Sequence, residues 1–276
     1  MSNAIAVYHG AFGRVTLYHL TKPMIKHAHR EGHLVFWVQG ATGRFTMKGV
    51  PCPISPESGA AANSWELHQY DPDDEINGQY VLVLYIKPSW FLNFSRSSTS
   101  ALKFGRPEIE MNGPIKSLVA KITSLLADGN GTDLLDGYLY ELTSESFAQS
   151  HQWLSGSHTV DLSPRINDFR IRKSIKLMSE CVGEEVDLDK VAVESGLSRP
   201  HFFKLFRTQI GVTPKLYWNT IRMEQALDQL AESPKSITDI SFDLGFSSQS
   251  SFSRFFAMNT GLAPTDYRRV AHVLHS

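Results

Sequence analysis

VAVESGLS at residues 191–198 and ISFDLGFS at residues 240–247 are two copies of one pattern. Each copy is followed by two phenylalanines with a basic residue between them, and then by a glycine, a proline and a tyrosine. In the first copy these are Phe202, Lys204, Phe206, Gly211, Pro214 and Tyr217, and in the second they are Phe252, Arg254, Phe256, Gly261, Pro264 and Tyr267. The repeat predicts two copies of one structural unit.

Each copy has the sequence pattern of a helix-turn-helix. In the first copy, Val191 lies on the apolar side of a short helix, Gly196 suits the left-handed backbone that ends this helix, and Ser198 can cap the next one. A turn this short sets two helices at a steep angle. The second copy opens with Ser236 and Asp239 at the spacing of a capping box. The chain therefore contains two predicted helix-turn-helix units.

The solvent side of the second helix in each unit carries polar and basic side chains. Lys204 and Arg254 occupy the same position of the repeat. A polar face is normally only solvated, but Arg, Gln and Ser hydrogen-bond base edges, and a Phe can press on a thymine methyl group. Two copies with one cation at the same position favour nucleic acid. The predicted DNA contacts are Arg199, Pro200, Phe203, Lys204, Arg207, Gln249, Ser250, Ser253 and Arg254.

Residues 213–232 connect the two units and are predicted to form one uninterrupted helix. Pro214 suits the first helical position, and no breaker follows it. Such a helix spans roughly 30 Å, close to the roughly 34 Å between successive major-groove faces of B-DNA. One rigid chain could therefore place both second helices in adjacent turns of the same groove.

Residues 163–269 resemble the AraC/XylS family of bacterial transcription regulators. The resemblance rests on the Gly-Phe-Ser-Ser-Gln-Ser run at residues 245–250 and on the spaced residues that follow it in the second copy. It implies binding to double-stranded promoter DNA, with base contacts from Pro200, Phe203, Lys204, Gln249, Ser250, Ser253 and Arg254. DNA binding of this kind would recruit or block RNA polymerase. Phe203 stands where family members usually carry a polar residue, and Ala257 where many carry a base.

From about residue 13 to residue 86, short apolar alternations are separated by Gly, Pro and Asn. This pattern predicts an all-β sandwich or barrel, and it resembles the cupin-type sensor domain common at the N-terminus of the same family. Gly40 and Gly43 are predicted to bracket a hairpin. Pro51, Pro53 and Pro56 mark a loop or an edge, where a central strand could not continue.

Four histidines stand out in this region: His27, His29, His33 and His68. Alternation along a strand would place His27 and His29 on the same face. Metal-binding cupins are similar, with a His-x-His pair, an acidic residue and a later His; here His33 takes the acidic place. Neutral imidazoles suit zinc, nickel or copper. We favour the alternative over a metal site: these histidines only form hydrogen bonds around the barrel mouth, or contact the carboxylate of a ligand.

We expect the four histidines to line an effector pocket, with or without a metal, and Trp37 to contact the effector. The sequence predicts no definite cofactor. The histidines suggest only a divalent transition metal in the barrel.

The predicted organisation is an α+β multidomain protein. Residues 1–153 form a cupin-like β barrel with flanking helices at about 114–127 and 132–153, which senses an effector. In the resembling family such helices often mediate dimerisation, so a homodimer is expected. Residues 154–163 form a linker that begins Leu-Ser-Gly-Ser, and residues 164–276 form an all-α domain of two helix-turn-helix units joined by a long helix.

Composition narrows the class of protein. No apolar run reaches the length of a membrane span, so a cytoplasmic protein without a membrane partner is expected. Cys52 and Cys181 lie in different predicted domains, which argues against a structural disulfide or a cysteine-based zinc site. Residues 164–276 hold 15 Lys and Arg against 13 Asp and Glu. Binding to DNA must therefore rely on locally placed cations and should depend only modestly on salt.

The favoured function is a sequence-specific DNA-binding transcriptional regulator that responds to a small molecule. One alternative is an enzyme, a metal-dependent cupin oxygenase or isomerase with accessory helices. A second is a constitutive DNA-binding protein whose barrel serves only assembly. The sequence offers no Ser-His-Asp, phosphate-loop or paired-carboxylate arrangement, so no catalysis is expected.

Overall fold

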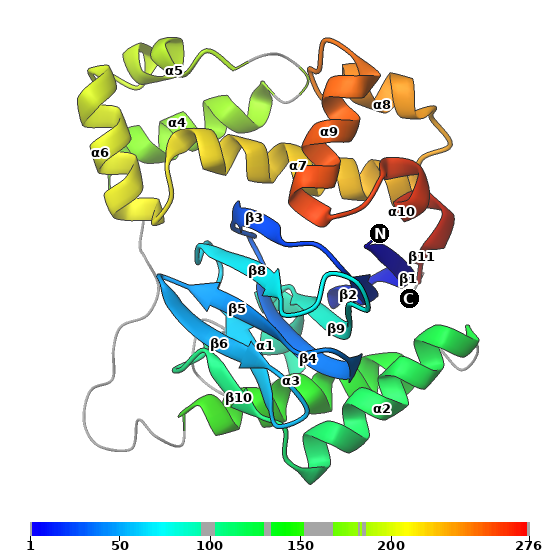
Figure 1. Ribbon diagram of the computed structural model, residues 1–276. Helices are drawn as coiled ribbons and strands as arrows, with labels where there is room; N and C mark the ends of the chain where they lie inside the picture. The colour runs from blue at the N-terminus through cyan, green and yellow to red at the C-terminus, as the bar shows by residue number, and fades with distance from the viewer. Residues whose placement is uncertain are drawn as a thin grey trace.

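The computed structural model describes residues 2–94, 103–129, 134–151, 168–181, 183 and 186–274. It has a β-rich lobe, formed by the described residues up to 151, and a helical lobe, formed by the described residues between 168 and 270 (Figure 1). The predicted linker at residues 154–163 lies outside the described residues. Within the described ranges, no helix combines the length and the apolar character needed to cross a membrane.

Two sheets form the β-rich lobe, as the alternating sequence predicts. The larger sheet has the order β10 (Glu108–Glu110), β7 (Ser58–Ala62), β4 (Gly32–Gly40), β9 (Gln79–Ile86), β2 (Gly13–Leu20), β1 (Asn3–Gly10) and β11 (Ala271–Val273). The smaller sheet has the order β3 (Met24–His27), β8 (His68–Pro72), β5 (Gly43–Met47) and β6 (Val50–Ile54).

Strand β9 shows why the larger sheet is buried on both faces. Val81, Val83 and Tyr85 belong to the core between the sheets, whereas Leu82 and Leu84 belong to a second core on the outer face. Successive side chains of a strand point to opposite faces, so the continuous apolar run fills both cores. The outer core is completed by α2 (Gly113–Asp128) and α3 (Leu135–His151), and α1 (Pro88–Phe94) follows β9.

Two local predictions for the β-rich lobe have different outcomes: the hairpin at Gly40 and Gly43 is wrong, and the proline-rich edge is confirmed. Gly40 and Gly43 do not bracket a hairpin, because β4 and β5 belong to different sheets and the chain crosses between the sheets there. The proline-rich strand β6 is the edge of the smaller sheet, where a missing N–H removes no ladder hydrogen bond.

The helical lobe contains the two predicted helix-turn-helix units. Its helices are α4 (Phe169–Glu180), α5 (Leu188–Glu194), α6 (Arg199–Ile210), α7 (Pro214–Glu232), α8 (Ile237–Asp243), α9 (Gln249–Thr260) and α10 (Pro264–Val270). The units are α5 with α6 and α8 with α9. Gly196 and Gly245 end the first helix of each unit at φ 73° and 71°. Ser236 and Asp239 form the expected capping box, whereas Ser198 begins α6 without a side-chain capping bond.

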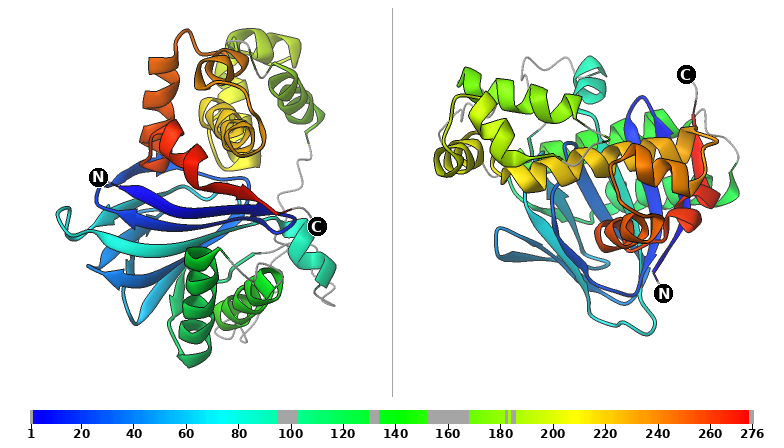
Figure 2. Two further views of the ribbon diagram at one scale, coloured as in Figure 1. Left: turned by 90° about the vertical axis from the view of Figure 1, so that its right-hand side faces the viewer. Right: turned by 90° about the horizontal axis from the view of Figure 1, so that it is seen from above.

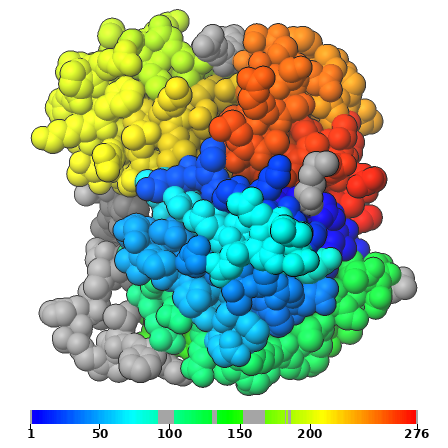
Figure 3. All heavy atoms as spheres, in the orientation of Figure 1, coloured from blue at the N-terminus to red at the C-terminus, as the bar shows by residue number. Residues whose placement is uncertain are grey.

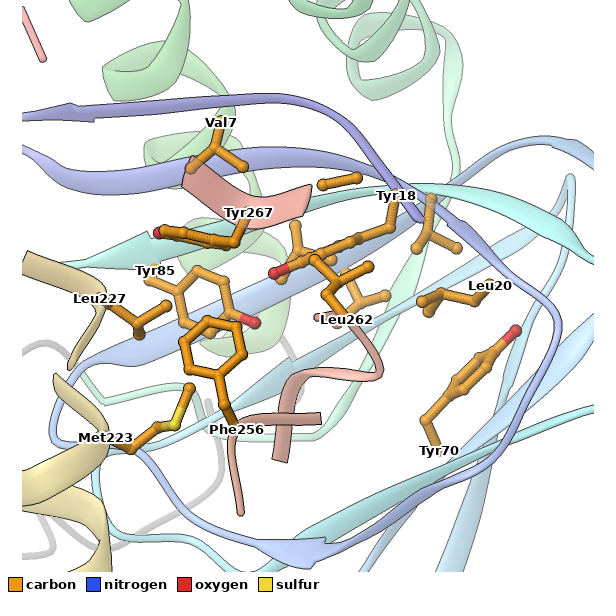
Figure 4. Packing of buried hydrophobic residues seen from close by; sticks show 14 of the residues in the cluster. Val7, Tyr18, Leu20, Tyr70, Tyr85, Met223, Leu227, Phe256, Leu262 and Tyr267 are labelled. Atoms are coloured by element: carbon orange, nitrogen blue, oxygen red, sulfur yellow. The ribbon is translucent and has the colours of Figure 1, made fainter. Parts of the chain in front are cut away.

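The two lobes share one core. The inner core of the β-rich lobe continues into α7, α9 and α10, and Figure 4 shows Phe256 and Tyr267 of the helical lobe packed beside Tyr85 of β9. Strand β11, which directly follows α10, pairs in parallel with β1. The space-filling view shows the lobes meeting along a broad front (Figure 3). The helical lobe is therefore docked on the barrel.

Candidate nucleic-acid interface and ligand cavity

The second helices of the two units, α6 and α9, lie near opposite ends of α7. Both run in the same direction, from top to bottom in Figure 1, and both are seen end-on from above in Figure 2. Phe202 and Phe206 of α6 and Phe252 and Phe256 of α9 are fully buried. Each helix thus packs by its phenylalanine side and leaves the opposite side to solvent.

Lys204 and Arg254 are exposed at equivalent positions of α6 and α9. Among the described residues, neither takes part in an ion pair with Asp or Glu. A cation without a carboxylate partner loses only water and counterions when it binds a phosphate or a base edge, because no ion pair within the protein has to break first.

The other predicted contacts divide by exposure. Pro200, Arg207, Gln249 and Ser250 are exposed, whereas Phe203 and Ser253 are half-buried. Arg199 forms an ion pair with Asp189, at 2.7 Å between Nη1 and Oδ2, and its guanidinium carbon lies 5.5 Å from the centre of the Phe203 ring. The side-chain oxygen of Gln249 accepts a hydrogen bond of 2.7 Å from the hydroxyl of Thr238. The amide NH2 of Gln249 and the remaining guanidinium donors of Arg199 take no part in these two contacts.

Helix α7 joins the units as one rod. Its 19 residues run from the cap at Thr213, whose side chain accepts from the N–H of Leu216, to Glu232. At 1.5 Å per residue, its length is roughly 28 Å. Arg222 fixes the rod to the second unit, because its Nε donates to the carbonyl of Leu244 at 2.9 Å and its guanidinium lies 3.7 Å from the centre of the Phe246 ring.

The structure brings the four predicted histidines together inside the barrel. His27 and His68 are cross-strand neighbours on β3 and β8, and their ring centres lie 4.4 Å apart. His33 on β4 lies 4.4 Å from His68 by the same measure. His29 follows the end of β3, rather than lying on the strand as predicted, and its ring centre is 4.8 Å from that of His27.

Hydrogen bonds fix which nitrogen of two rings carries the proton. The Nδ1–H of His27 donates to the carbonyl of Ile25 at 2.6 Å, and the Nδ1–H of His68 donates to the carbonyl of Glu66 at 2.7 Å. A carbonyl oxygen can only accept, so Nε2 of a neutral ring is left with its lone pair free. The Nε2 of His68 and the Nδ1 of His33 are buried and have no hydrogen-bond partner among the described residues.

Burial keeps the histidine cluster neutral. Burial first, and then the charges of His27 and Arg14, lower the pKa of His33 to about 3. Burial also lowers the pKa of His27, of His29 and of His68, and in His29 and His68 the neighbouring rings add to this effect. A neutral imidazole is the form that binds metals and accepts hydrogen bonds.

A cavity of about 490 Å³ lies between the barrel and α7. Arg14, Arg30 and Lys87 line it from the barrel side. The α7 side contributes an acidic stripe at four-residue spacing: Glu224, Asp228 and Glu232. Residues four apart lie on one face of a helix, so an acidic stripe faces a barrel side of mixed charge, where Glu31 lines the cavity beside the three basic side chains. Sequence reasoning missed both walls, although the lone Arg14 within an apolar strand pattern was a signal.

The segment of residues 27–31 bridges the two lobes beside this cavity. The hydroxyl of Thr220 on α7 donates to the carbonyl of Ala28 at 3.2 Å. Glu224 accepts from the backbone N–H of Arg30 at 3.2 Å and forms an ion pair with its guanidinium at 3.7 Å. His27 and His29 line the cavity from the same segment. One short segment therefore contacts the histidine cluster, the cavity and α7.

Trp37 does not join the histidines. Its indole N–H donates to the carbonyl of Ala41 at 3.1 Å, and the residue lines neither the interlobe cavity nor the small space among the histidines. It lies four residues beyond His33 along β4, so the strand carries it away from the cluster. Tyr85, by contrast, lines both spaces and lies 3.8 Å from the guanidinium of Arg14.

Comparison with known proteins identifies both lobes. Residues 13–143 match the AraC-like ligand binding domain, and residues 191–270 match a helix-turn-helix domain. The chain belongs to the AraC family of transcriptional regulators. It is therefore a DNA-binding regulator with an effector-binding domain, as the sequence predicts.

Curated relatives of this AraC-family chain are similar over most of their length. The transcriptional activator RhaS of Klebsiella pneumoniae is 25% identical over 253 residues, which cover 87% of this chain and 86% of RhaS. The probable transcriptional regulator LumQ of Photobacterium leiognathi is 24% identical over 249 residues, covering 90% and 94%. The crystal structure of ToxT from Vibrio cholerae with a bound unsaturated fatty acid matches with a TM-score of 0.60 at 16% identity, covering 93% and 94%. This last likeness concerns the fold.

Glu224 gives the interface between the lobes a dependence on pH. Burial first, and then the charge of Glu31, raise the pKa of Glu224 to about 7, above its ordinary value of 4.5. Between these two values the folded state holds a proton that the unfolded state has lost, so the free energy of unfolding falls as pH rises through that window. The fall is at most about 1.4 kcal/mol per pH unit.

The variant Glu224→Gln cannot ionise and keeps an acceptor for the N–H of Arg30. We expect it to be more stable than the natural protein at about pH 8, and to lose that advantage at about pH 5. Urea denaturation of both proteins across this range measures the difference. Parallel stability curves would contradict the assignment.

Proposed function

We propose that this regulator reads two successive major-groove segments of one promoter, with α6 in the first and α9 in the second. The single observation that carries the proposal is the pair of exposed cations, Lys204 and Arg254, at equivalent positions of two helices joined by one rod. The rod is roughly 28 Å long, of the order of one turn of B-DNA. Pro200, Phe203, Arg207, Gln249, Ser250 and Ser253 would complete the base and backbone contacts, and Arg199 would reach a phosphate.

A hydroxyl-radical footprint on a bound promoter tests this proposal. We expect two protected segments on one face of the DNA, separated by about 10–10.5 base pairs. A single protected segment, or two on opposite faces, would show that only one unit binds or that the units do not share an orientation.

We propose that the effector enters the cavity between the barrel and α7. In support, the cavity is lined by charged side chains from both lobes, so a small polar ligand could contact both at once. His27 and His29 line this cavity, and they share an adjoining small space with His33 and His68, so the four histidines would form the inner end of the effector site. A ligand that favours one arrangement of the lobes shifts the population toward it, and the arrangement of α7 sets that of both DNA-binding units. The unsaturated fatty acid named for ToxT belongs to that protein; the charged walls here favour a more polar molecule.

Two further partners are proposed from the family. RNA polymerase would be recruited or blocked at the promoter, and the chain would act as a homodimer. In support of the second point, α2 and α3 cover the face of the barrel that lies away from the helical lobe (Figure 1), so a dimer formed there leaves α6 and α9 free. Sedimentation at micromolar concentration should show twice the chain mass of 31.0 kDa; a particle of one chain mass would contradict the dimer.

A metal-dependent enzyme is the less supported alternative. The curated relatives over most of the chain are transcriptional regulators. The histidine cluster, which suggested the enzyme, also fits a regulator, because a metal or a ligand bound there lies next to the contacts with α7.

A further inference from the structure

Three histidines of the barrel offer nitrogens that converge on one point. One ring nitrogen from each of His27, His29 and His68 lies within 4.8 Å of the other two. These residues come from β3, from the segment after it and from β8, so the fold brings together donors that are about 40 residues apart in sequence. His33 lies beside them.

The hydrogen bonds of His27 and His68 are of the kind that metal-binding histidines make. A histidine that binds a metal through one nitrogen almost always donates its other N–H to a carbonyl or carboxylate, which fixes the ring. His27 and His68 each do this through Nδ1, to the carbonyls of Ile25 and Glu66. The Nε2 of His68 is then a buried acceptor without a partner in the part of the chain that the structure describes. Buried polar atoms without a partner are rare in native proteins, and here a cation would satisfy this one.

We propose that His27, His29 and His68 bind one divalent transition-metal ion. Three imidazoles suit zinc, nickel or copper. A set of three protein ligands leaves a coordination position for water or for an atom of a bound molecule. Two of the three ligands, His27 and His29, also line the interlobe cavity, so an effector in that cavity could reach the ion.

The site is connected to α7 through the segment that carries two of its ligands. Zinc–nitrogen bonds are about 2.0–2.1 Å long, so an ion would draw nitrogens that now lie up to 4.8 Å apart closer together. This contraction moves the segment of residues 27–31, which holds α7 through Ala28 with Thr220 and through Arg30 with Glu224. The ion therefore changes how α7, and with it both DNA-binding units, sits on the barrel. This second step rests on the proposed function.

Metal binding is tested on the full chain without an affinity tag, after treatment with a chelator and dialysis. Titration with Co²⁺ should give visible d–d absorption that saturates near one ion per chain, and Zn²⁺ should displace it. The variants His68→Ala and His29→Gln should weaken binding by at least roughly 100-fold, since loss of outer-shell partners alone costs 10–100-fold. His19→Ala is the matched control, because His19 bonds to Asn3 and Asn77 away from the cluster.

Circular dichroism of each variant shows whether it is folded, and His29→Gln keeps most of the volume of a half-buried side chain. Absence of saturable binding by the natural chain overturns the site, as does binding that both folded variants retain unchanged.

The connection to DNA is tested separately, by promoter affinity with and without the ion. We expect a change of about 5- to 150-fold, the usual range for coupled sites. Thr220→Val removes the hydroxyl that holds Ala28 and should reduce this change while the Co²⁺ spectrum stays the same. Metal binding with equal promoter affinity in both states overturns the connection. If DNA binding fails in every state while the Co²⁺ spectrum remains, the proposed function fails and the metal site stands.

Discussion

Replacement of Arg254 by alanine is expected to weaken binding to the specific promoter by roughly 1–3 kcal/mol, or about 5- to 150-fold. Arg254 is exposed on α9 and engages no carboxylate among the described residues. A base contact made by arginine is lost entirely in the variant, because alanine offers no donor. Titration of labelled promoter DNA, at one fixed salt concentration, measures the change.

Arg269→Ala is the matched control. Arg269 is also exposed, but it lies on α10 and forms an ion pair with Asp266 at 3.6 Å. It should alter affinity only slightly, since it removes one charge away from the groove. Lys204→Ala should resemble Arg254→Ala. Equal affinities of the Arg254 and Arg269 variants for the specific site would refute the assignment of α9 as a reading helix.

Replacement of Phe256 by alanine is expected to lower the free energy of unfolding by about 3–5 kcal/mol. Phe256 is fully buried in the core shared by the two lobes, and its ring centre lies 5.6 Å from that of Tyr267 and 5.9 Å from that of Phe252. The substitution leaves a cavity at the junction of the lobes (Figure 4). Unfolding in urea, followed by fluorescence and by circular dichroism, should show the loss.

Phe242→Ala on α8 is the comparison, because Phe242 is 54% exposed. It should change stability by no more than about 0.5 kcal/mol. A loss below about 1 kcal/mol for the Phe256 variant would show that the shared core contributes little to holding the lobes together.

The helical lobe could be predicted from the sequence because its signals are local. Gly196 adopts the left-handed conformation expected of it, Ser236 and Asp239 form the capping box, and the chain continues as one helix from Pro214 to Glu232. Each of these features depends on residues within one or two turns. The duplication then supplied the same pattern twice, which reduced the chance of a coincidental match.

The histidine cluster was also predictable, though for a less local reason. The His-x-His pair and a later histidine indicated a site, and the structure brings the four rings together. Trp37 lines neither the interlobe cavity nor the space among the histidines, because distance along a strand takes a side chain away even when it faces the same side, and its contact with an effector stays a prediction. The expected hairpin at Gly40 and Gly43 failed because glycine signals a turn without telling which sheet the next strand joins.

The junction of the lobes could not be predicted from the sequence. Its contacts join residues nearly two hundred positions apart, such as Ala28 with Thr220 and Arg30 with Glu224. His9 and Tyr267, whose ring nitrogen and hydroxyl lie 2.7 Å apart, are still more distant in sequence. Residues of this kind look like ordinary surface or loop residues until the packing is known. The acidic stripe on α7 illustrates the point, since it resembles a solvated helix face and in fact borders a cavity.

The helical phasing of the promoter tests most directly whether the two units read one face of DNA as a rigid pair. The footprinted site is altered by inserting about five base pairs, half a turn, between the two protected segments. Because α7 holds α6 and α9 in one orientation, we expect this half-turn insertion to lower the specific affinity toward that of one segment alone. We expect the insertion of a full turn to restore the affinity only in part, since the rod has a fixed length. Unchanged affinity after the half-turn insertion would contradict the account.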